Sequence, residues 1–172
     1  LETDASVRCR ACEGLLEVQH RRPDLPGVVL RGLFQTRCCS RPDTTQSGVW
    51  RFQELVMPTA GPSPVSHPEG NTPLLYRRAI ADWAGVADLF LKHEGHNPTG
   101  SFKDRGMTVA LSVAVGQGAE AVVCASTGNT SASMAAYASA AGLQPIIFLP
   151  HGNISYGKLA QALEYGALTL QV

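Results

Sequence analysis

The sequence lacks any imbalance of charge. Fourteen basic residues match fourteen acidic ones, so the formal net charge is +0, and Lys and Arg form no long run. Proteins that bind nucleic acids or anionic membranes usually carry a basic patch, because it attracts phosphate groups. We therefore expect neither nucleic acid nor a membrane among the partners.

Long apolar segments are also missing. No stretch approaches the roughly 20 apolar residues that span a membrane. The first residues, LETDAS, contain neither the basic start nor the apolar segment of a signal peptide. The five cysteines are odd in number and scattered, unlike the disulfide framework of a secreted domain. We therefore expect a soluble, cytoplasmic protein.

The chain has 172 residues, of which 44% are hydrophobic. A chain of this length can bury roughly 70% of the surface that its unfolded form exposes, so a core forms without disulfides or metal. It begins with Leu rather than Met and ends in ALTLQV, which resembles a strand that simply stops. We therefore expect a fragment of a longer protein.

The chain divides into two parts that differ in composition and hydrophobic pattern. Residues 1–66 are predicted to form an irregular N-terminal arm, since Pro and Gly are frequent up to about residue 73. Residues 67–172 contain short apolar strands alternating with helical segments, which is typical of an α/β fold with a parallel sheet. The expected strands are 121–125, 145–150 and 167–172, and the expected helices are 102–116, 131–141 and 156–165.

The segment HNPTGSFKDRGM places a lysine at the start of a helix. A turn at 97–100 precedes Ser101, which is expected to cap the helix, with Asp104 as its capping-box partner. Lys103 then lies in the first turn, where the helix dipole favours a neutral amine, the form that a Schiff-base nucleophile requires. The alternative is an ordinary capped helix, with Asp104 as a cap and Arg105 as a surface charge.

The segment STGNTSAS follows the first expected strand and opens the next helix. Ser126, Thr127 and Thr130 can donate hydrogen bonds to an anion, and Asn129 can donate its amide to an oxygen. The alternative is a plain connection in which Thr130 or Ser131 caps a helix of Ala and Ser that packs on the sheet.

The last helical segment, HGNISYGKLAQALEYGA, is interpreted as scaffold. Leu159, Ala162 and Leu163 have the spacing of a core-facing stripe. Lys158 and Gln161 are expected to be solvent residues.

Cys9 and Cys12 have the spacing of one half of a zinc ribbon. The other available pair, Cys38 and Cys39, consists of neighbours, which complete a tetrahedral thiolate site with difficulty. We therefore expect no metal, and we describe the N-terminal arm as carrying a degenerate zinc-ribbon-like motif.

These motifs together resemble the fold-type II pyridoxal-phosphate enzymes, and among them most closely the threonine synthases. The likeness extends to the N-terminal segments CRACEGLLEVQH, SGVWRFQELVMP and EGNTPLL. The resemblance implies a three-layer sandwich with a parallel sheet covered by helices, of which this chain supplies the arm and much of the smaller domain. It also implies that the loop for the cofactor phosphate and the partner of the pyridine nitrogen lie beyond residue 172.

The resemblance assigns roles to individual residues. Lys103 matches the lysine that binds pyridoxal 5′-phosphate and shuttles protons, and Phe102 matches the residue that packs beside the cofactor. Asn129 matches the asparagine that hydrogen-bonds the cofactor's 3′-oxygen. The residues that match the loop around the substrate's α-carboxylate are Ser126, Thr127 and Thr130.

The implied reaction converts O-phospho-L-homoserine and water to L-threonine and phosphate. This is the chemistry of a carbon–oxygen lyase that acts on a phosphorylated small molecule, and similar enzymes are often homodimers. Threonine dehydratase and cysteine synthase share the layout of lysine and asparagine loop and stay open as alternatives. A synthase-like protein that binds ligands without catalysis is a further alternative.

Overall fold

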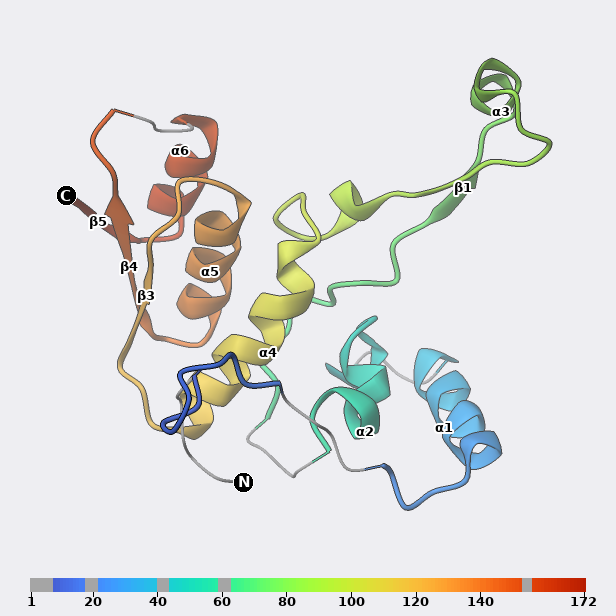
Figure 1. The fold of residues 1–172 in the computed structure, drawn as a ribbon, viewed down its shortest axis with the longest axis horizontal. Helices are drawn as coiled ribbons and strands as arrows, with labels where there is room; N and C mark the ends of the chain where they lie inside the picture. The colour runs from blue at the N-terminus through green and yellow to red at the C-terminus, as the bar shows by residue number, and fades with distance from the viewer. Residues whose placement is uncertain (1–7, 18–21, 40–43, 59–62, 153–155) are drawn as a thin grey trace.

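The structure is a computed structural model that describes residues 8–17, 22–39, 44–58, 63–152 and 156–172. Its central layer is a parallel sheet in the order β3 (Ala121–Cys124), β4 (Gln144–Leu149) and β5 (Leu168–Gln171). Helices α5 (Asn129–Ala140) and α6 (Tyr156–Glu164) connect these strands and lie on the same face of the sheet (Figure 1). The expected parallel α/β arrangement is confirmed, with element bounds within two residues of those predicted.

Helix α5 is buried on all sides. It lies between the sheet and α4 (Lys103–Gly116), as Figure 1 shows, and α6 packs beside it. Every residue from 131 to 138 is buried, and most are Ala or Ser. Small side chains allow α4, α6 and the sheet to approach together, so the Ala/Ser composition reflects packing. The core here includes Leu111, Tyr137 and Ile147.

The expectation of an irregular N-terminal arm is wrong for part of it. Residues Gly27–Cys39 form α1, a helix of 13 residues. The carbonyl of Pro26 accepts the N–H groups of Val29 and Leu30 and so starts the first turn. The short 3-10 helices η1 (Thr44–Gln46) and η2 (Trp50–Phe52) follow, and then α2 (Gln53–Val56).

Contacts of Trp50 and Gly48 help to attach this N-terminal part to α4 and to the segment before β1. The indole N–H of Trp50 donates to Thr108 Oγ1 of α4 at 2.6 Å, and that hydroxyl donates to the carbonyl of Val65 at 2.7 Å. Gly48 crosses Gly70 so closely that a Cβ on Gly48 would lie 2.7 Å from the Gly70 backbone. The division of the chain between residues 66 and 67 stays a prediction.

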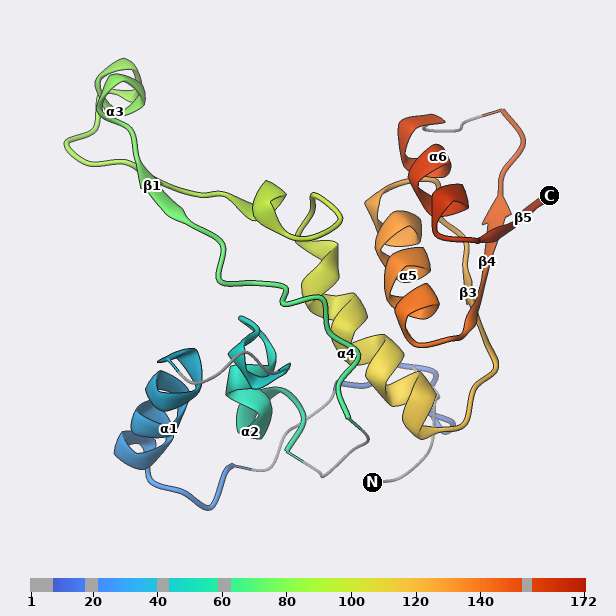
Figure 2. The same cartoon turned by 180° about the vertical axis from the view of Figure 1, so that it is seen from behind.

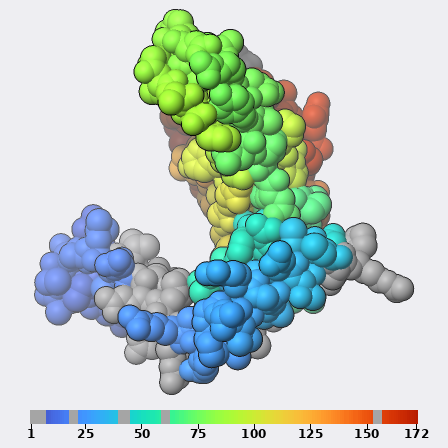
Figure 3. All heavy atoms as spheres, turned by 90° about the vertical axis from the view of Figure 1, so that its right-hand side faces the viewer, coloured from blue at the N-terminus to red at the C-terminus, as the bar shows by residue number. Residues whose placement is uncertain are grey.

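A ribbon of two antiparallel strands stands away from the α/β layers (Figures 1 and 2). It pairs β1 (Leu74–Tyr76) with β2 (Phe90–Lys92), and α3 (Arg78–Ala84) connects the two strands. Figure 3 shows this ribbon, in green, on the opposite side of the molecule from α1. A 3-10 helix, η3 (Glu94–His96), leads from β2 toward α4. No helix of the described residues is long and apolar enough to cross a membrane.

Candidate active site

The turn before α4 is held by hydrogen bonds on every side. The N–H of Gly100 donates to the carbonyl of Asn97 at 2.8 Å, and Gly100 has a φ of +80°, which glycine adopts at little cost. The buried Asn97 side chain accepts the N–H of Gly70 at 2.9 Å and donates to the carbonyl of Glu94 at 2.8 Å. The turn predicted at 97–100 is therefore confirmed.

The predicted capping box at the start of α4 is wrong, because Phe102 rather than Ser101 occupies the N-cap position and no side chain caps the helix there. Ser101 Oγ accepts a backbone N–H, but from Lys103, at 3.2 Å. Asp104 does not reach back to Ser101, because its fully buried carboxylate accepts the N–H and the hydroxyl of Thr99 and the hydroxyl of Ser133. Thr99 and Ser133 therefore donate to the charged Asp104 side chain, and the spacing of residues in the sequence does not reveal these contacts.

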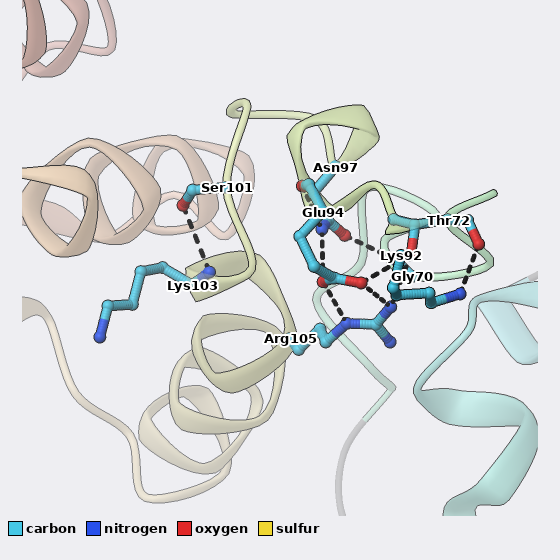
Figure 4. Close-up of polar contacts among 8 residues, drawn as sticks. All are labelled: Gly70, Thr72, Lys92, Glu94, Asn97, Ser101, Lys103 and Arg105. Atoms are coloured by element: carbon cyan, nitrogen blue, oxygen red, sulfur yellow. Dashed lines mark hydrogen bonds and ion pairs between the residues drawn. The ribbon is translucent and has the colours of Figure 1, made fainter. Parts of the chain in front are cut away.

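Lys103 carries an amine with no hydrogen-bond partner among the described residues. Of the three lysines, all of which are described, Lys92 donates to the carbonyl of Thr72 and Lys158 donates to Gln161 Oε1 at 3.1 Å. Lys103 Nζ instead lies over the ring of Phe102, 4.7 Å from its centroid. Figure 4 shows this side chain pointing away from the neighbouring polar cluster. The half-buried amine is therefore available to a ligand.

A hollow of about 440 Å³ adjoins this amine. Small-molecule sites in proteins commonly have volumes of about 300–1,000 Å³. Of the predicted site residues, Lys103, Phe102 and Thr130 line it together, so the starts of α4 and α5 share one concave surface. The rest of its wall is Arg105, Gly106 and Met107.

Ser126, Thr127 and Asn129 are not part of this wall, but they lie just before Thr130 in the chain. Ser126 and Thr127 belong to the loop after β3, and Asn129 is the exposed first residue of α5. The structure therefore places these three at or just before the start of α5, outside the wall of the hollow.

No side chain caps the start of α5. Gly128 occupies the N-cap position, and the Ser131 hydroxyl donates to the carbonyl of Gly128 at 2.8 Å. The alternative in which Thr130 or Ser131 caps the helix is therefore wrong. The first N–H groups of a helix have no partner within it and carry the positive end of its dipole, so this end can bind an anion.

Arg105 is an internal ion-pair partner rather than a surface charge. It contacts both carboxylate oxygens of Glu94, through Nε at 2.8 Å and Nη2 at 2.9 Å (Figure 4). Thr72 Oγ1 donates to the same carboxylate at 2.6 Å. Arg105, followed by Thr72, lowers the pKa of Glu94 from 4.5 to about 2. The pair connects α4 to η3, and Thr72 joins the segment before β1 to it.

Glu69 and Tyr137 form a buried pair that the sequence interpretation missed. Glu69 is fully buried and accepts the hydroxyl of Tyr137 at 2.8 Å, the hydroxyl of Ser66 and the N–H of His67. Burial, and then the nearby charge of Glu69, raises the pKa of Tyr137. Because the two residues are 68 positions apart, no local pattern signals their contact.

The expectation that Lys158 and Gln161 are solvent residues is wrong. Both are partly buried, and both donate to the carbonyl of Thr99, at 3.4 Å and 3.3 Å. Helix α6 therefore contacts the turn that precedes Lys103.

The cysteines form no cluster among the described residues. Cys9 and Cys12 lie in a hairpin closed by a bridge between Arg8 and Leu15. Cys38 accepts a hydrogen bond from Arg51 at 3.2 Å. Within the parts of the chain that the structure describes, no group of three or more His, Cys, Asp or Glu side chains is placed to hold a metal ion.

Comparison with known proteins adds to this geometry. Residues 65–172 match the family described as "Pyridoxal-phosphate dependent enzyme". The chain is 42% identical to a threonine synthase of Methanocaldococcus jannaschii over 171 residues, which are 99% of this chain and 40% of that protein. It is 56% identical over 108 residues to a threonine synthase of Bacillus sp. (strain ULM1), covering 63% of this chain and 30% of that one.

The fold also resembles solved structures. A serine racemase from Dictyostelium discoideum superposes with a TM-score of 0.53 at 28% identity, over 59% of this chain and 33% of that one. The α/β part of the chain therefore has the fold of these enzymes. The chain spans less than half the length of the curated relatives that it matches.

Proposed function

Because the chain belongs to the family of pyridoxal-phosphate-dependent enzymes, we propose that it is part of a threonine synthase in which Lys103 holds the cofactor. The observation that carries this proposal is the amine of Lys103, which has no hydrogen-bond partner in the described parts of the chain and adjoins a hollow that also reaches α5. A lysine without such a partner can use its lone pair once it loses its proton.

Residues of the hollow and of the start of α5 fit pyridoxal phosphate. The cofactor presents an aldehyde, an aromatic ring and several oxygens. Lys103 supplies an amine for the aldehyde, and the exposed ring of Phe102 supplies an aromatic surface beside it. The side-chain amide of Asn129 is a donor for a ring oxygen.

The substrate's carboxylate is proposed to bind at the start of α5. Ser126, Thr127 and Thr130 offer hydroxyl donors there, and the free N–H groups of the helix add to them. A carboxylate is favoured at this end of a helix because the dipole is positive there.

Bound pyridoxal phosphate supplies an electron sink, while the protein supplies orientation and proton transfer. In the proposed mechanism the amine of Lys103 would accept the proton from the substrate's α carbon. It then returns a proton to the carbon skeleton as phosphate leaves and water adds. Phe102 shields one side of the amine from water.

The proposed reaction converts O-phospho-L-homoserine and water to L-threonine and phosphate. Its support is the similarity to proteins named threonine synthase, including one that matches 99% of this chain. Threonine dehydratase and cysteine synthase are the competing activities, since they are expected to share the lysine and the asparagine loop.

Three assays on the longest reading frame that contains this chain separate these activities. We expect phosphate release from O-phospho-L-homoserine, and neither 2-oxobutanoate from threonine nor sulfide incorporation into O-acetylserine. Lys103→Ala and Lys103→Arg should both lose turnover, because neither residue can bind the aldehyde and exchange protons. Normal turnover in either variant would contradict the proposal. Cofactor binding without turnover of any substrate would favour a binding protein.

A further inference from the structure

The carboxylate of Asp104 is fully buried, and three hydrogen bonds compensate for its charge. One oxygen accepts the backbone N–H of Thr99 at 2.8 Å. The other accepts the hydroxyls of Thr99 and Ser133, each at 2.5 Å. A buried carboxylate is costly unless donors surround it, so these bonds hold their partners firmly. The three residues come from the turn before α4, from α4 and from α5.

These contacts link the start of α4 to the start of α5, and the candidate site lies at these two helix starts. Asp104 directly follows Lys103, and Ser133 lies one helical turn after Asn129 on the same face of α5. Among the described residues of α4 and α5, the bond between Asp104 and Ser133 is the only hydrogen bond that joins the two helices.

Thr99 connects a third helix to the same point. Its N–H and hydroxyl donate to Asp104, and its carbonyl accepts from Lys158 and Gln161 of α6. All the polar groups of Thr99 are therefore engaged, and the residue is 4% exposed. The turn that precedes Lys103 cannot shift without breaking bonds to α4 or to α6.

We propose that Asp104 is a positioning residue that fixes Lys103 relative to the anion-binding start of α5. The inference rests on the proposed function, because the distance between Lys103 and the start of α5 matters only if a cofactor binds between them. A site built from two elements needs its groups fixed to within a fraction of an ångström, because small misplacements cost much of the rate.

Ser133→Ala tests this proposal against Ser112→Ala as a matched control. Ser112 is also a buried helical serine, and it donates to the carbonyl of Thr108 at 2.6 Å, later in α4 and away from Lys103. Both variants lose one buried hydroxyl, so both should lower the unfolding temperature, Ser133→Ala by more because its hydrogen bond is to a carboxylate. They should differ in how much they slow the reaction of Lys103 with pyridoxal phosphate.

The readout is the initial rate at which pyridoxal phosphate becomes attached to each lysine of the longest reading frame, trapped by borohydride and measured by peptide mass spectrometry. In Ser133→Ala we expect labelling of Lys103 to slow about tenfold, as for the loss of a hydrogen bond to a charged group. Labelling of Lys92, whose amine donates to Thr72 rather than to Thr99, should not change. Ser112→Ala should label all three like the wild type.

Thr99→Val provides a second test, because it removes a different donor to Asp104 with little change of shape. It should also slow the labelling of Lys103 selectively. Wild-type labelling of Lys103 in Ser133→Ala, or equal slowing in Ser112→Ala, would overturn the positioning role alone. A wild-type Lys103 that reacts no faster than Lys92 and Lys158 would overturn the proposed function as well.

Discussion

At the residue scale, the ion pair between Glu94 and Arg105 predicts a particular dependence of stability on pH. Glu94→Gln should lower the free energy of unfolding at neutral pH by about 1–2 kcal/mol, since it weakens two charged hydrogen bonds. The pKa of Glu94 is about 2 in the folded protein and ordinarily 4.5, so its contribution is complete above pH 4.5 and disappears as the pH falls toward 2.

Urea unfolding across a pH series measures this difference. The gap between wild type and Glu94→Gln should close between pH 4.5 and about 2. Glu164→Gln is the control, because Glu164 is exposed on α6, and it should change stability little at any pH. A gap that stays constant down to pH 2 would show that the charge of Glu94 does not produce the effect.

Individual site residues were predictable only where local sequence places them. Lys103 and Thr130 follow a turn and a strand respectively, so a helix start is expected near each of them, and the structure brings both to one hollow. The contacts of Asp104 with Ser133 and of Glu69 with Tyr137 depend on how distant segments pack. No spacing rule within one element contains that information.

At the scale of elements, the crossing of Gly48 and Gly70 predicts a severe effect of a single methyl group. In Gly48→Ala the new Cβ would lie 2.2 Å from the backbone nitrogen of Asn71, and backbone cannot move aside as a flexible side chain does. We expect a loss of at least about 2 kcal/mol of stability, as for an overpacked interior.

Gly32→Ala is the matched control for this effect. Gly32 lies within α1, and a Cβ there would meet no atom within 4 Å. Alanine should stabilise the helix by about 0.5–1 kcal/mol, because it restricts the unfolded chain more than glycine does. Thermal unfolding of both variants measures the contrast, and a loss of stability in both would mean that the close approach is not the cause.

The elements of the α/β part could be predicted because each has a local signal. Short apolar strands between turn residues, and helices that start after polar loops, gave bounds within two residues of the structure. Helix α1 was missed because Pro and Gly surround a segment of modest hydrophobicity, PGVVLRGLF. Phe34 of this helix packs edge-on against Phe52 at a centroid distance of 5.0 Å, a tertiary contact that the local composition does not indicate.

At the scale of the whole molecule, two apolar surfaces predict that the isolated chain associates with itself. Trp83 of α3 and Phe90 of β2 are exposed on the ribbon and its connecting helix, and one face of the parallel sheet exposes Val123, Leu168 and Leu170. Parallel sheets are normally covered on both faces, and contiguous exposed apolar surface favours association. The 172-residue chain should therefore bind an apolar fluorescent dye and sediment as more than a monomer.

Replacing both Leu168 and Leu170 with Thr should reduce dye binding and association while keeping a residue type that favours strands. The longest reading frame should show less of both behaviours than the 172-residue chain. A monomeric chain that does not bind the dye would mean that these surfaces are too dispersed to drive association.

The central claim is that Lys103 holds pyridoxal phosphate, and the most direct measurement is the site of attachment. The protein encoded by the longest reading frame would be saturated with pyridoxal phosphate, reduced with borohydride and digested. The masses of its peptides would then be measured by mass spectrometry. The account predicts one pyridoxyl group per chain, on Lys103. A folded protein with Lys103 unmodified, or with the label spread equally over Lys92, Lys103 and Lys158, would contradict it.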